Sequence, residues 1–442
     1  MSNHKRVPKR IATTIINSLR GGVVPRNGTG YIAVGRQNEI KALLNDVEIV
    51  ADGGATFRFV VGRYGSGKSF LFQTIRSYVM DRDFVVIDAD LSPERRFAGN
   101  QGQGLATYKE LMKNMSTRTK PDGGALPLIL DRWINSIKTQ VVQESSYEIG
   151  SNEFNKAVER KIYSVINDIQ ELVNGFDFAK VISLYWQASR EDNEEMKRNA
   201  QRWLRGEYRL KTDIRKDLGI TAMITDENWF DYIKLFAVFL VKAGYRGMLM
   251  LVDELVNIYK IPHSITRQYN YEKILTMYND TLQGKASYLG IIMSGTPQCV
   301  EDQRRGIFSY DALRSRLESG RFTDSNTHDL LSPIIPLEPL TQEELFVLIE
   351  KLAIIHADLY SYESTITEKD MLDFLKMEFD RIGSGISLTP REVIRDYIEI
   401  LNIIYQNPDK SMQDIIGSDS LTLSENSIIE DEIHKDFVGF DI

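Results

Sequence analysis

The apolar positions of the chain fall into short runs that are separated by segments with helical periodicity. Five such runs predict buried strands, and they occupy residues 57–61, 84–90, 248–252, 289–293 and 334–337. Segments with apolar positions three and four residues apart lie between these runs, and one of them opens at residue 70. Alternation of buried strands with helices is typical of a parallel sheet that is covered on both faces. The pattern therefore predicts an α/β protein with a parallel-sheet core.

The stretch between the second and third of these runs has a different pattern. Residues 94–240 contain long helical periods, for example at 153–173 and 193–203. A Lys-Pro-Asp-Gly-Gly turn signal at 120–124 lies near the beginning of this stretch. A segment of this length can form a subdomain of its own. We therefore expect a large helical insertion between two core strands, and we expect it to be the surface on which partner proteins dock.

Both ends of the chain also predict helices. A helix is expected around residues 11–20, followed by a Gly-Gly-Val-Val-Pro loop and a second helix that begins near Arg36. From Thr341 to about Tyr405 the pattern is helical, and Thr389-Pro390 is a typical helix start within it. The predicted division is an N-terminal helical arm at 1–50, a core formed by 51–93 and 241–338, the insertion at 94–240, a helical lid at 339–406 and an acidic tail at 407–442.

The composition is that of an ordinary globular protein, with 42% apolar and 26% charged residues. No apolar run approaches the roughly 20 residues that a membrane-spanning helix needs. The N-terminal Lys and Arg residues precede no secretory apolar segment. The only cysteine is Cys299, which excludes an internal disulfide framework. We therefore expect a cytoplasmic protein without a membrane partner.

The net charge of −8 gives no general sign of nucleic-acid binding, but the charges are unevenly distributed. Residues 1–38 hold seven Lys or Arg and no acid, whereas residues 411–442 hold eight acids and one base. A basic leading arm can contact the phosphates of DNA, and the same composition also fits a solvated terminus. Both interpretations stay open from the sequence.

The most specific motif is the segment Gly62-Arg63-Tyr64-Gly65-Ser66-Gly67-Lys68-Ser69, which has the form G-x-x-x-x-G-K-[ST] of a phosphate-binding loop. It follows a predicted strand and opens a predicted helix at Phe70, which is the context that the motif requires. Its glycines let backbone N–H groups turn inward around a polyphosphate, and the helix N-terminus adds partial positive charge. We expect Lys68 to reach the β- and γ-phosphates and the Ser69 hydroxyl to ligate Mg²⁺. The predicted ligands are a nucleoside triphosphate and magnesium.

A pair of carboxylates forms the second candidate element. Five apolar residues at 248–252 lead directly to Asp253 and Glu254. Such a strand delivers its last residues to the carboxyl edge of a parallel sheet, where ligands bind in open α/β folds. We expect Asp253 to hold Mg²⁺ through water and Glu254 to polarise the attacking water as a general base. The pair favours ATP hydrolysis over phosphoryl transfer to a metabolite, and the chain lacks the Asn-Lys-x-Asp sequence expected for guanine recognition.

A third candidate element follows the predicted strand at 289–293. The hydroxyl groups of Ser294 and Thr296 can hydrogen-bond the attacking water or an oxygen of the γ-phosphate. The same Ser-Gly-Thr-Pro sequence is also good turn chemistry, so a purely structural role stays open.

Three arginines are candidates for stabilising charge on the transferred phosphoryl group. Arg316, with Arg314 as the second choice, is expected to act as an arginine finger, either on a neighbouring subunit or within its own. Arg391 lies in the first turn of a predicted C-terminal helix and is expected to couple the position of the lid to the nucleotide state. Surface ion pairs are the alternative role for each of these residues.

In their order along the chain, these elements resemble those of the AAA+ superfamily of P-loop ATPases. Gly35-Arg36-Gln37-Asn38-Glu39 resembles the box beside the adenine, Gly62–Ser69 looks like Walker A, and Asp253-Glu254 looks like Walker B. Ser294 and Thr296 stand where sensor 1 belongs, Arg314-Ser315-Arg316 resembles the Ser-Arg finger of origin-recognition-type members, and Thr389-Pro390-Arg391 is similar to sensor 2. The resemblance implies that ATP binds with Gly35 and Arg36 beside it and that identical subunits assemble into an oligomer.

A narrower resemblance covers most of the chain. The opening at 16–25 with Val34-Gly35-Arg36, the stretch Trp203-Leu204-Arg205-Gly206-Glu207 and the short aromatic and acidic C-terminus look like the BREX-type ATP-binding proteins of bacterial anti-phage islands. This resemblance implies an ATPase that works on DNA beside a methyltransferase, a helicase or other defence proteins. Three functions stay open from the sequence: an ATP-hydrolysing switch or motor, a nucleotide-gated scaffold with little turnover, and a kinase of a small metabolite.

Overall fold

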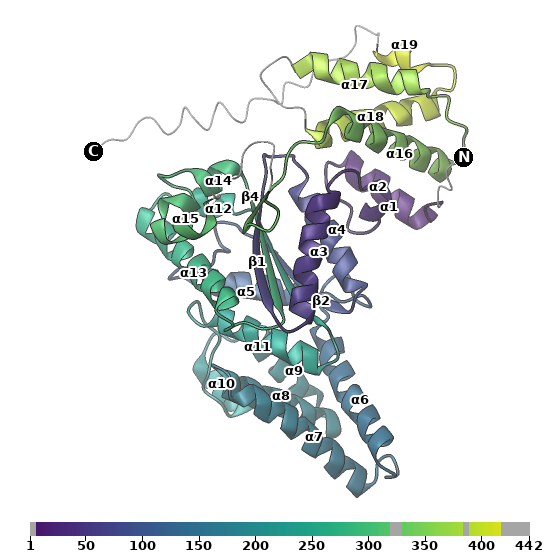
Figure 1. Cartoon of the computed structure of the whole chain (residues 1–442). Helices are drawn as coiled ribbons and strands as arrows, with labels where there is room; N and C mark the ends of the chain where they lie inside the picture. Colours follow the sequence, from purple (N-terminus) through teal and green to yellow (C-terminus); the bar gives the residue numbers. More distant parts are fainter. Residues whose placement is uncertain (1–5, 319–328, 383–388, 417–442) are drawn as a thin grey trace. The chain divides into compact units, whose positions relative to one another are not determined.

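The computed structural model describes residues 6–318, 329–382 and 389–416. The chain divides into two compact units (Figure 1). One unit comprises Val24–Thr341, and the other combines Met1–Val23 with Gln342–Ile442. Most of the acidic tail that the sequence predicts at 407–442 lies outside the described residues, as does Lys5 of the basic N-terminal segment.

A five-stranded parallel sheet forms the centre of the unit Val24–Thr341 (Figure 1). Its strands are β1 (Ala55–Val61), β2 (Phe84–Asp90), β3 (Gly247–Asp253), β4 (Leu289–Gly295) and β5 (Ile334–Pro336). Their order across the sheet is β2-β3-β4-β1-β5, and every neighbouring pair is parallel. Each strand overlaps one of the five predicted runs, so the predicted α/β fold with a parallel core is confirmed. The arrangement is that of a P-loop NTPase-like core.

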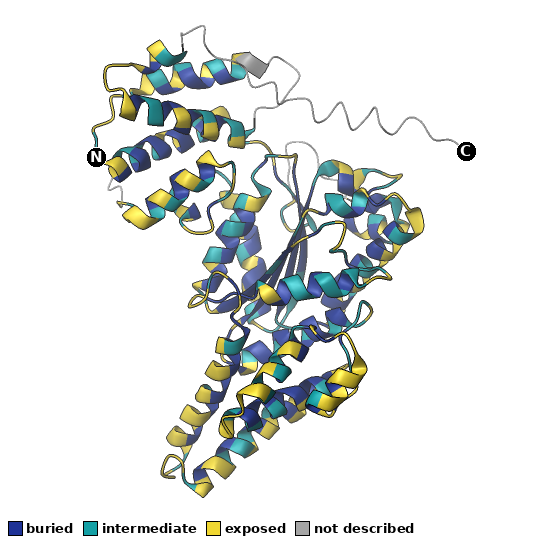
Figure 2. Cartoon of the chain, turned by 180° about the vertical axis from the view of Figure 1, so that it is seen from behind, coloured by how far each residue is buried: buried dark blue, intermediate teal, exposed yellow. Residues whose placement is uncertain are grey.

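The alternation of side chains along the strands gives the sheet two buried faces. On one face, Val60, Leu251 and Ile292 pack with α3 (Gln37–Ala51) and α4 (Lys68–Met80). On the other face, side chains such as Phe59 and Met250 pack beneath α5 (Gln103–Lys113), α11 (Trp229–Lys242) and α13 (Ser264–Leu282). Figure 2 shows the strands as buried between these layers. Burial on both faces explains why the strands are almost continuously apolar in sequence.

Helices occupy the chain between β2 and β3. They are α5, α6 (Leu126–Glu144), α7 (Asn152–Gln170), α8 (Gly175–Arg190), α9 (Glu194–Leu204), α10 (Lys211–Leu218) and α11. Within this segment α7 packs on α8, α8 on α9, and α9 on α10. Trp133, Trp203 and Trp229 are fully buried among these helices. Their apolar interior is continuous with one face of the sheet, so these helices and the sheet belong to the same compact unit.

Short helices complete this unit near the carboxyl ends of the strands and before β1. They are α2 (Thr29–Ile32), α12 (Val256–Tyr259), α14 (Pro297–Glu301) and α15 (Asp311–Leu317). Because all five strands are parallel, their carboxyl ends share one edge of the sheet. The residues that follow β1, β3 and β4 therefore meet at that edge.

The second unit is helical in its described part. It contains α1 (Lys9–Arg20), α16 (Gln342–Tyr360), α17 (Glu368–Ile382), α18 (Pro390–Gln406) and α19 (Met412–Ile416). Helix α1 packs on α16 and α18 through Ala12, Ile15, Ile16 and Leu19, which lie on one side of the helix. Thr389 is the N-cap of α18, as the sequence predicts, and the structure adds a capping box with Glu392. The N-terminal helix thus packs with the C-terminal helices. The boundary after Val23 falls in the loop predicted at 21–25, but the sequence did not indicate that the helix before it belongs with the C-terminal helices.

Across the described residues of both units, no helix combines the length and the apolar character needed to cross a bilayer.

Candidate functional site

The loop Gly62–Ser69 joins β1 to α4. Gly65 and Gly67 adopt φ angles of +77° and +92°, which a residue with a Cβ atom adopts only with strain. A Cβ atom on Gly62 would lie 2.8 Å from the carbonyl oxygen of Leu337, so only glycine permits the close approach of these two backbones. The Lys68 ammonium donates to the carbonyl oxygens of Gly62 and Arg63, each at 2.8 Å. The loop therefore curls around the lysine head, as expected of an anion cradle.

The remaining loop side chains have different surroundings. Arg63 and Tyr64 are exposed at the tip of the loop, Ser66 is buried, and Phe70 is half-buried in the first turn of α4. The tip of the loop is therefore open to solvent, whereas Ser66 inside the loop is buried.

Asp253, the last residue of β3, joins three segments of the chain. Its Oδ2 atom accepts a hydrogen bond from the Ser69 hydroxyl at 2.8 Å. Its Oδ1 atom accepts from the Glu254 backbone N–H at 2.8 Å and from the hydroxyl of Ser294. Ser294 is fully buried at the end of β4. The structure thus brings together Ser69, Asp253, Glu254 and Ser294 from three places in the sequence.

The donor set at Ser69 and Asp253 fits a magnesium ion. A hydroxyl and a carboxylate are hard oxygen ligands, and Mg²⁺ is commonly held by one or two protein oxygens together with water and substrate phosphates. Among the described residues, no group of three or more His, Cys, Asp and Glu is arranged to hold a metal ion by itself. A magnesium ion at this place would accordingly depend on the phosphates of a bound nucleotide.

Glu254 has an unusual backbone conformation. Its φ angle is +65°, in the left-handed region that is unfavourable for a residue with a Cβ atom. The hydrogen bond from its N–H to Asp253 holds this turn, and the Glu254 side chain is exposed at the sheet edge. Backbone strain of this kind clusters at functional sites. The sequence placed Glu254 at this edge but contained no signal for its strained conformation.

Asp90, at the end of β2, is a further acidic residue at the same edge. It is opposite Asp253 in the ladder between β2 and β3. Desolvation, together with the nearby carboxylates of Asp253, Asp88 and Glu254, raises the pKa of Asp90 to about 6. Desolvation is the larger cause of this shift, and the neighbouring carboxylates, which also contribute, form a group of negative charges that attracts a cation. The sequence analysis did not select Asp90, although its position as the last residue of a predicted strand was an available signal.

Arg36 lies beside the phosphate loop. It has a φ angle of +61° and follows Gly35, whose φ angle is +62°. Its guanidinium donates to the Ser66 carbonyl oxygen at 3.2 Å and to the carbonyl oxygen of Glu338, and it pairs with Glu39 at 3.3 Å. Arg36 therefore links the phosphate loop to the chain that follows β5.

The other predicted residues have separate local roles in the structure. Thr296 caps α14, where its hydroxyl accepts from the Cys299 N–H at 3.4 Å. Arg314 pairs with Asp311 at 3.2 Å, and the exposed Arg316 donates to the Ala312 carbonyl oxygen at 2.6 Å, so both arginines have partners within α15. Arg391 is exposed in the first turn of α18 and belongs to the other unit.

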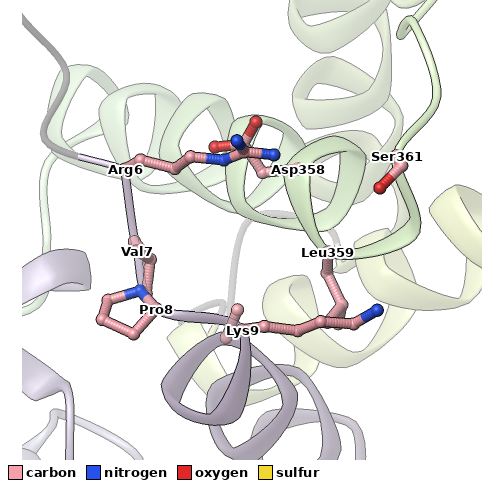
Figure 3. A pocket seen from close by; sticks show the side chains of 8 residues that line it. Arg6, Val7, Pro8, Lys9, Asp358, Leu359 and Ser361 are labelled. Atoms are coloured by element: carbon pink, nitrogen blue, oxygen red, sulfur yellow. The ribbon is translucent and has the colours of Figure 1, made fainter.

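Part of the basic N-terminal segment is incorporated into a helix. Its cations Lys9, Arg10 and Arg20 lie on α1, which packs within the helical unit. A pocket of about 310 Å³ in that unit is bordered by Arg6 and Lys9 from this segment and by Asp358 from α16 (Figure 3). The pocket carries both signs of charge. It contains no residue of the phosphate loop or of the carboxylate pair.

Comparison with known proteins gives a family for the chain. No curated protein gives a significant match to the chain. Residues 7–420 match the family model described as BREX system ATP-binding protein BrxC/D. That description names ATP as the ligand of the family. The chain therefore belongs to the BrxC/D family of BREX system ATP-binding proteins, and its role is to bind ATP in BREX anti-phage defence.

Proposed function

We propose that the protein is a magnesium-dependent ATPase of the AAA+ type that acts as a switch or motor in its BREX system. The observation that carries this proposal is the 2.8 Å hydrogen bond between Ser69 and Asp253, which aligns the phosphate loop with the end of β3. Glu254 follows Asp253 directly and is exposed at the same edge. A nucleotide in the loop would therefore present its γ-phosphate near the carboxylates of Asp253 and Glu254.

The residues of the site have distinct roles in this proposal. Lys68 and the loop N–H groups hold the phosphates, and Ser69 and Asp253 hold Mg²⁺, which neutralises phosphate charge when it is bound. Glu254 accepts a proton from the attacking water as the bond to the γ-phosphorus forms and the bond to the departing ADP oxygen breaks. Ser294 donates to Asp253, which makes it a positioning residue for that carboxylate. Thr296 remains the candidate for contact with the water or the γ-phosphate.

The proposal extends to assembly. Arg316, or alternatively Arg314, acts as an arginine finger toward the nucleotide of a neighbouring copy or of its own subunit, and the exposure of Arg316 supports this role. Arg391 reports nucleotide state through the helices at 339–406, which act as a lid. The oligomer works in the cytoplasm on or near DNA, beside partners such as a methyltransferase or a helicase.

The test is hydrolysis by the Glu254→Gln variant. We expect Mg²⁺-dependent release of phosphate by the unaltered protein, loss of at least 100-fold of this activity in the variant, and retained ATP binding. Glu272→Gln, which changes an exposed residue of α13 in the same way, is the matched control and should leave the rate unchanged. Turnover of Glu254→Gln at the normal rate would show that another group is the base.

Two further measurements separate the alternatives. Binding of ATP without turnover, together with a nucleotide-dependent change in mass, would favour a nucleotide-gated scaffold. Stoichiometric phosphorylation of a metabolite would favour a kinase. Light scattering of the full chain with a slowly hydrolysed ATP analogue, with and without DNA, tests the proposed oligomer directly, because a monomer under all conditions contradicts it.

A further inference from the structure

The corner formed by α9 and α10 concentrates positive charge in an otherwise acidic chain. Residues 197–216 contain eight Lys or Arg and two acids, a net charge of +6, whereas the whole chain carries −8. The exposed cations of this corner, here called the α9–α10 basic surface, are Arg198, Arg202, Arg209, Lys211, Arg215 and Lys216. They extend from the middle of α9 to the last turn of α10. The basic surface is thus local and not a consequence of overall charge.

Most of these cations are not neutralised by the protein. Arg202 pairs with Asp217 at 3.7 Å and lies over the Tyr208 ring, 4.5 Å from its centroid. Within the described part of the chain, no ion pair includes any of the other five exposed cations: Arg198, Arg209, Lys211, Arg215 and Lys216. Exposed cations on short, ordered helices are normally interspersed with acids. The basic surface therefore presents several charges without intramolecular counterions.

The helices that carry this surface are rigidly attached. The Tyr108 hydroxyl donates to the Leu204 carbonyl oxygen at 2.6 Å, which joins the end of α9 to α5. The indole N–H of Trp203 donates to the Ala222 carbonyl oxygen at 2.8 Å, and the Tyr208 hydroxyl donates to Asp217 at 2.9 Å. The helices that carry the cations are thus held in place, which lowers the entropy cost of binding a large ligand.

The positive region continues onto α5. Burial, together with the nearby Arg209 guanidinium, lowers the pKa of Lys109, while Glu207 opposes the shift. Helix α5 follows β2, whose last residue is opposite Asp253. The basic surface is therefore connected through one loop and one helix to the edge of the sheet that carries the candidate nucleotide site.

We propose that the α9–α10 basic surface binds the phosphate backbone of double-stranded DNA. Lys211 and Arg215 are four positions apart on α10, which places them on neighbouring turns of the exposed side, and Lys216 widens this row. Arginine, with its planar fork of donors, supplies most of the cations of the surface and suits phosphate oxygens. This proposal rests on the DNA association included in the proposed function and assigns it a place.

The surface suits DNA better than an acidic protein. A stable protein interface has an apolar centre, and among residues 197–216 the single large apolar side chain with high exposure is Leu210 at 58%. Backbone contacts to DNA need cations and no apolar centre, and they carry no sequence information. The expected binding is therefore salt-dependent and largely independent of base sequence.

The experiment compares two matched triple substitutions in the full chain. The test variant is Lys211→Glu, Arg215→Glu and Lys216→Glu. The control variant is Lys156→Glu, Arg160→Glu and Lys180→Glu, which alters exposed cations of α7 and α8 with the same residue types and the same charge change. Binding of a fluorescent random-sequence duplex of about 30 base pairs is measured by anisotropy at several salt concentrations.

We expect the test variant to lose at least about tenfold in affinity near 100 mM salt and the salt slope to fall by about 0.9 for each phosphate contact removed. The control variant should retain most of the affinity. A second variant with Gln at the same three α10 positions removes the charges without reversing them. It should lose less DNA affinity than the Glu variant, and unchanged thermal unfolding would show that it is folded. Normal affinity and slope in both α10 variants, or an equal loss in the control, would overturn the proposed location while leaving DNA binding in place.

Absence of duplex binding by the unaltered chain, with and without ATP, would overturn this proposal and the DNA part of the proposed function together. The hydrolysis test on Glu254 does not depend on DNA, so that outcome would leave the ATPase assignment to be decided separately. Binding of an acidic protein at this surface without any duplex binding would replace DNA as the occupant.

Discussion

The Ser69 hydroxyl donates to the Asp253 carboxylate at 2.8 Å, although 184 positions separate the two residues in the chain. Ser69 lies at the start of α4, which follows β1, and β1 is not a neighbour of β3 because β4 lies between them. The contact forms because the phosphate loop begins over the end of β4, where the Gly62 N–H donates to the Gly295 carbonyl oxygen at 3.1 Å. The hydroxyl of Ser294, on β4 itself, donates to the same carboxylate. Asp253 is thus the group on which three adjacent strands converge.

Ser69 and Asp253 should act as one unit in nucleotide binding. We expect Ser69→Ala and Asp253→Asn each to weaken Mg²⁺-dependent ATP binding by about tenfold, because each removes one hard oxygen ligand. The double variant should bind ATP almost as tightly as whichever single variant binds it less tightly. The losses in binding free energy are not additive when two residues share a partner. Calorimetric titration with ATP in Mg²⁺ and in EDTA measures this directly. Fully additive losses would show that the two residues act independently.

The conformation of Glu254 predicts a stability gain from glycine. At a φ angle of +65° a residue with a Cβ atom has a strained backbone, whereas glycine adopts this angle without strain. We expect Glu254→Gly to raise the free energy of unfolding by about 1 kcal/mol relative to Glu254→Ala. Thermal unfolding without nucleotide is the appropriate measurement, because both variants lack the carboxylate. Equal stability of the two variants would mean that the turn is not strained in solution.

Arg36 should influence nucleotide affinity through the backbone of the phosphate loop. Lysine cannot reproduce the fork that donates to the carbonyl oxygens of Ser66 and Glu338. We therefore expect Arg36→Lys to weaken ATP binding by about tenfold with little change in charge. The control is Arg246→Lys, because Arg246 precedes β3 at the opposite end of the strand and pairs with Glu48 at 2.8 Å. Equal affinity of the Arg36 variant and the control would exclude this role.

His356 should make the helical unit sensitive to mild acid. The ring is fully buried, with Nδ1 2.9 Å from the Tyr362 hydroxyl and Nε2 3.3 Å from Asn402 Oδ1. Burial lowers the pKa of His356, while the Asn402 hydrogen bond opposes the shift. The unfolded chain then binds the proton more readily than the folded one. Stability is complete above the unfolded pKa of about 6.5 and falls as the pH drops below it toward the folded pKa.

The corresponding measurement is thermal unfolding between about pH 7.5 and pH 5 for the unaltered chain and for His356→Phe. The unaltered chain should lose stability with a slope of at most about 1.4 kcal/mol per pH unit from this residue. The variant should be less stable at neutral pH, because the hydroxyl of Tyr362 and the amide of Asn402 lose a partner, and its stability should depend less on pH. An identical pH dependence in both proteins would assign the acid sensitivity to other groups.

The sequence by itself determined the strands, the phosphate loop and the family. A strand buried on both faces must be apolar throughout, and a loop that turns its N–H groups inward must have glycine where φ is positive, so both leave local signatures. The start of α18 at Thr389 and Pro390 is likewise a local signal.

Only the tertiary structure decided which distant segments meet. The donation of Ser294 to Asp253, the link from Arg36 to Glu338 and the packing of α1 on α16 and α18 depend on strand order and helix packing. The strained turn at Glu254 depends on the hydrogen bonds around it. Such relationships join residues that lie far apart in the chain or depend on the surrounding fold, and no local pattern encodes the order in which parallel strands assemble.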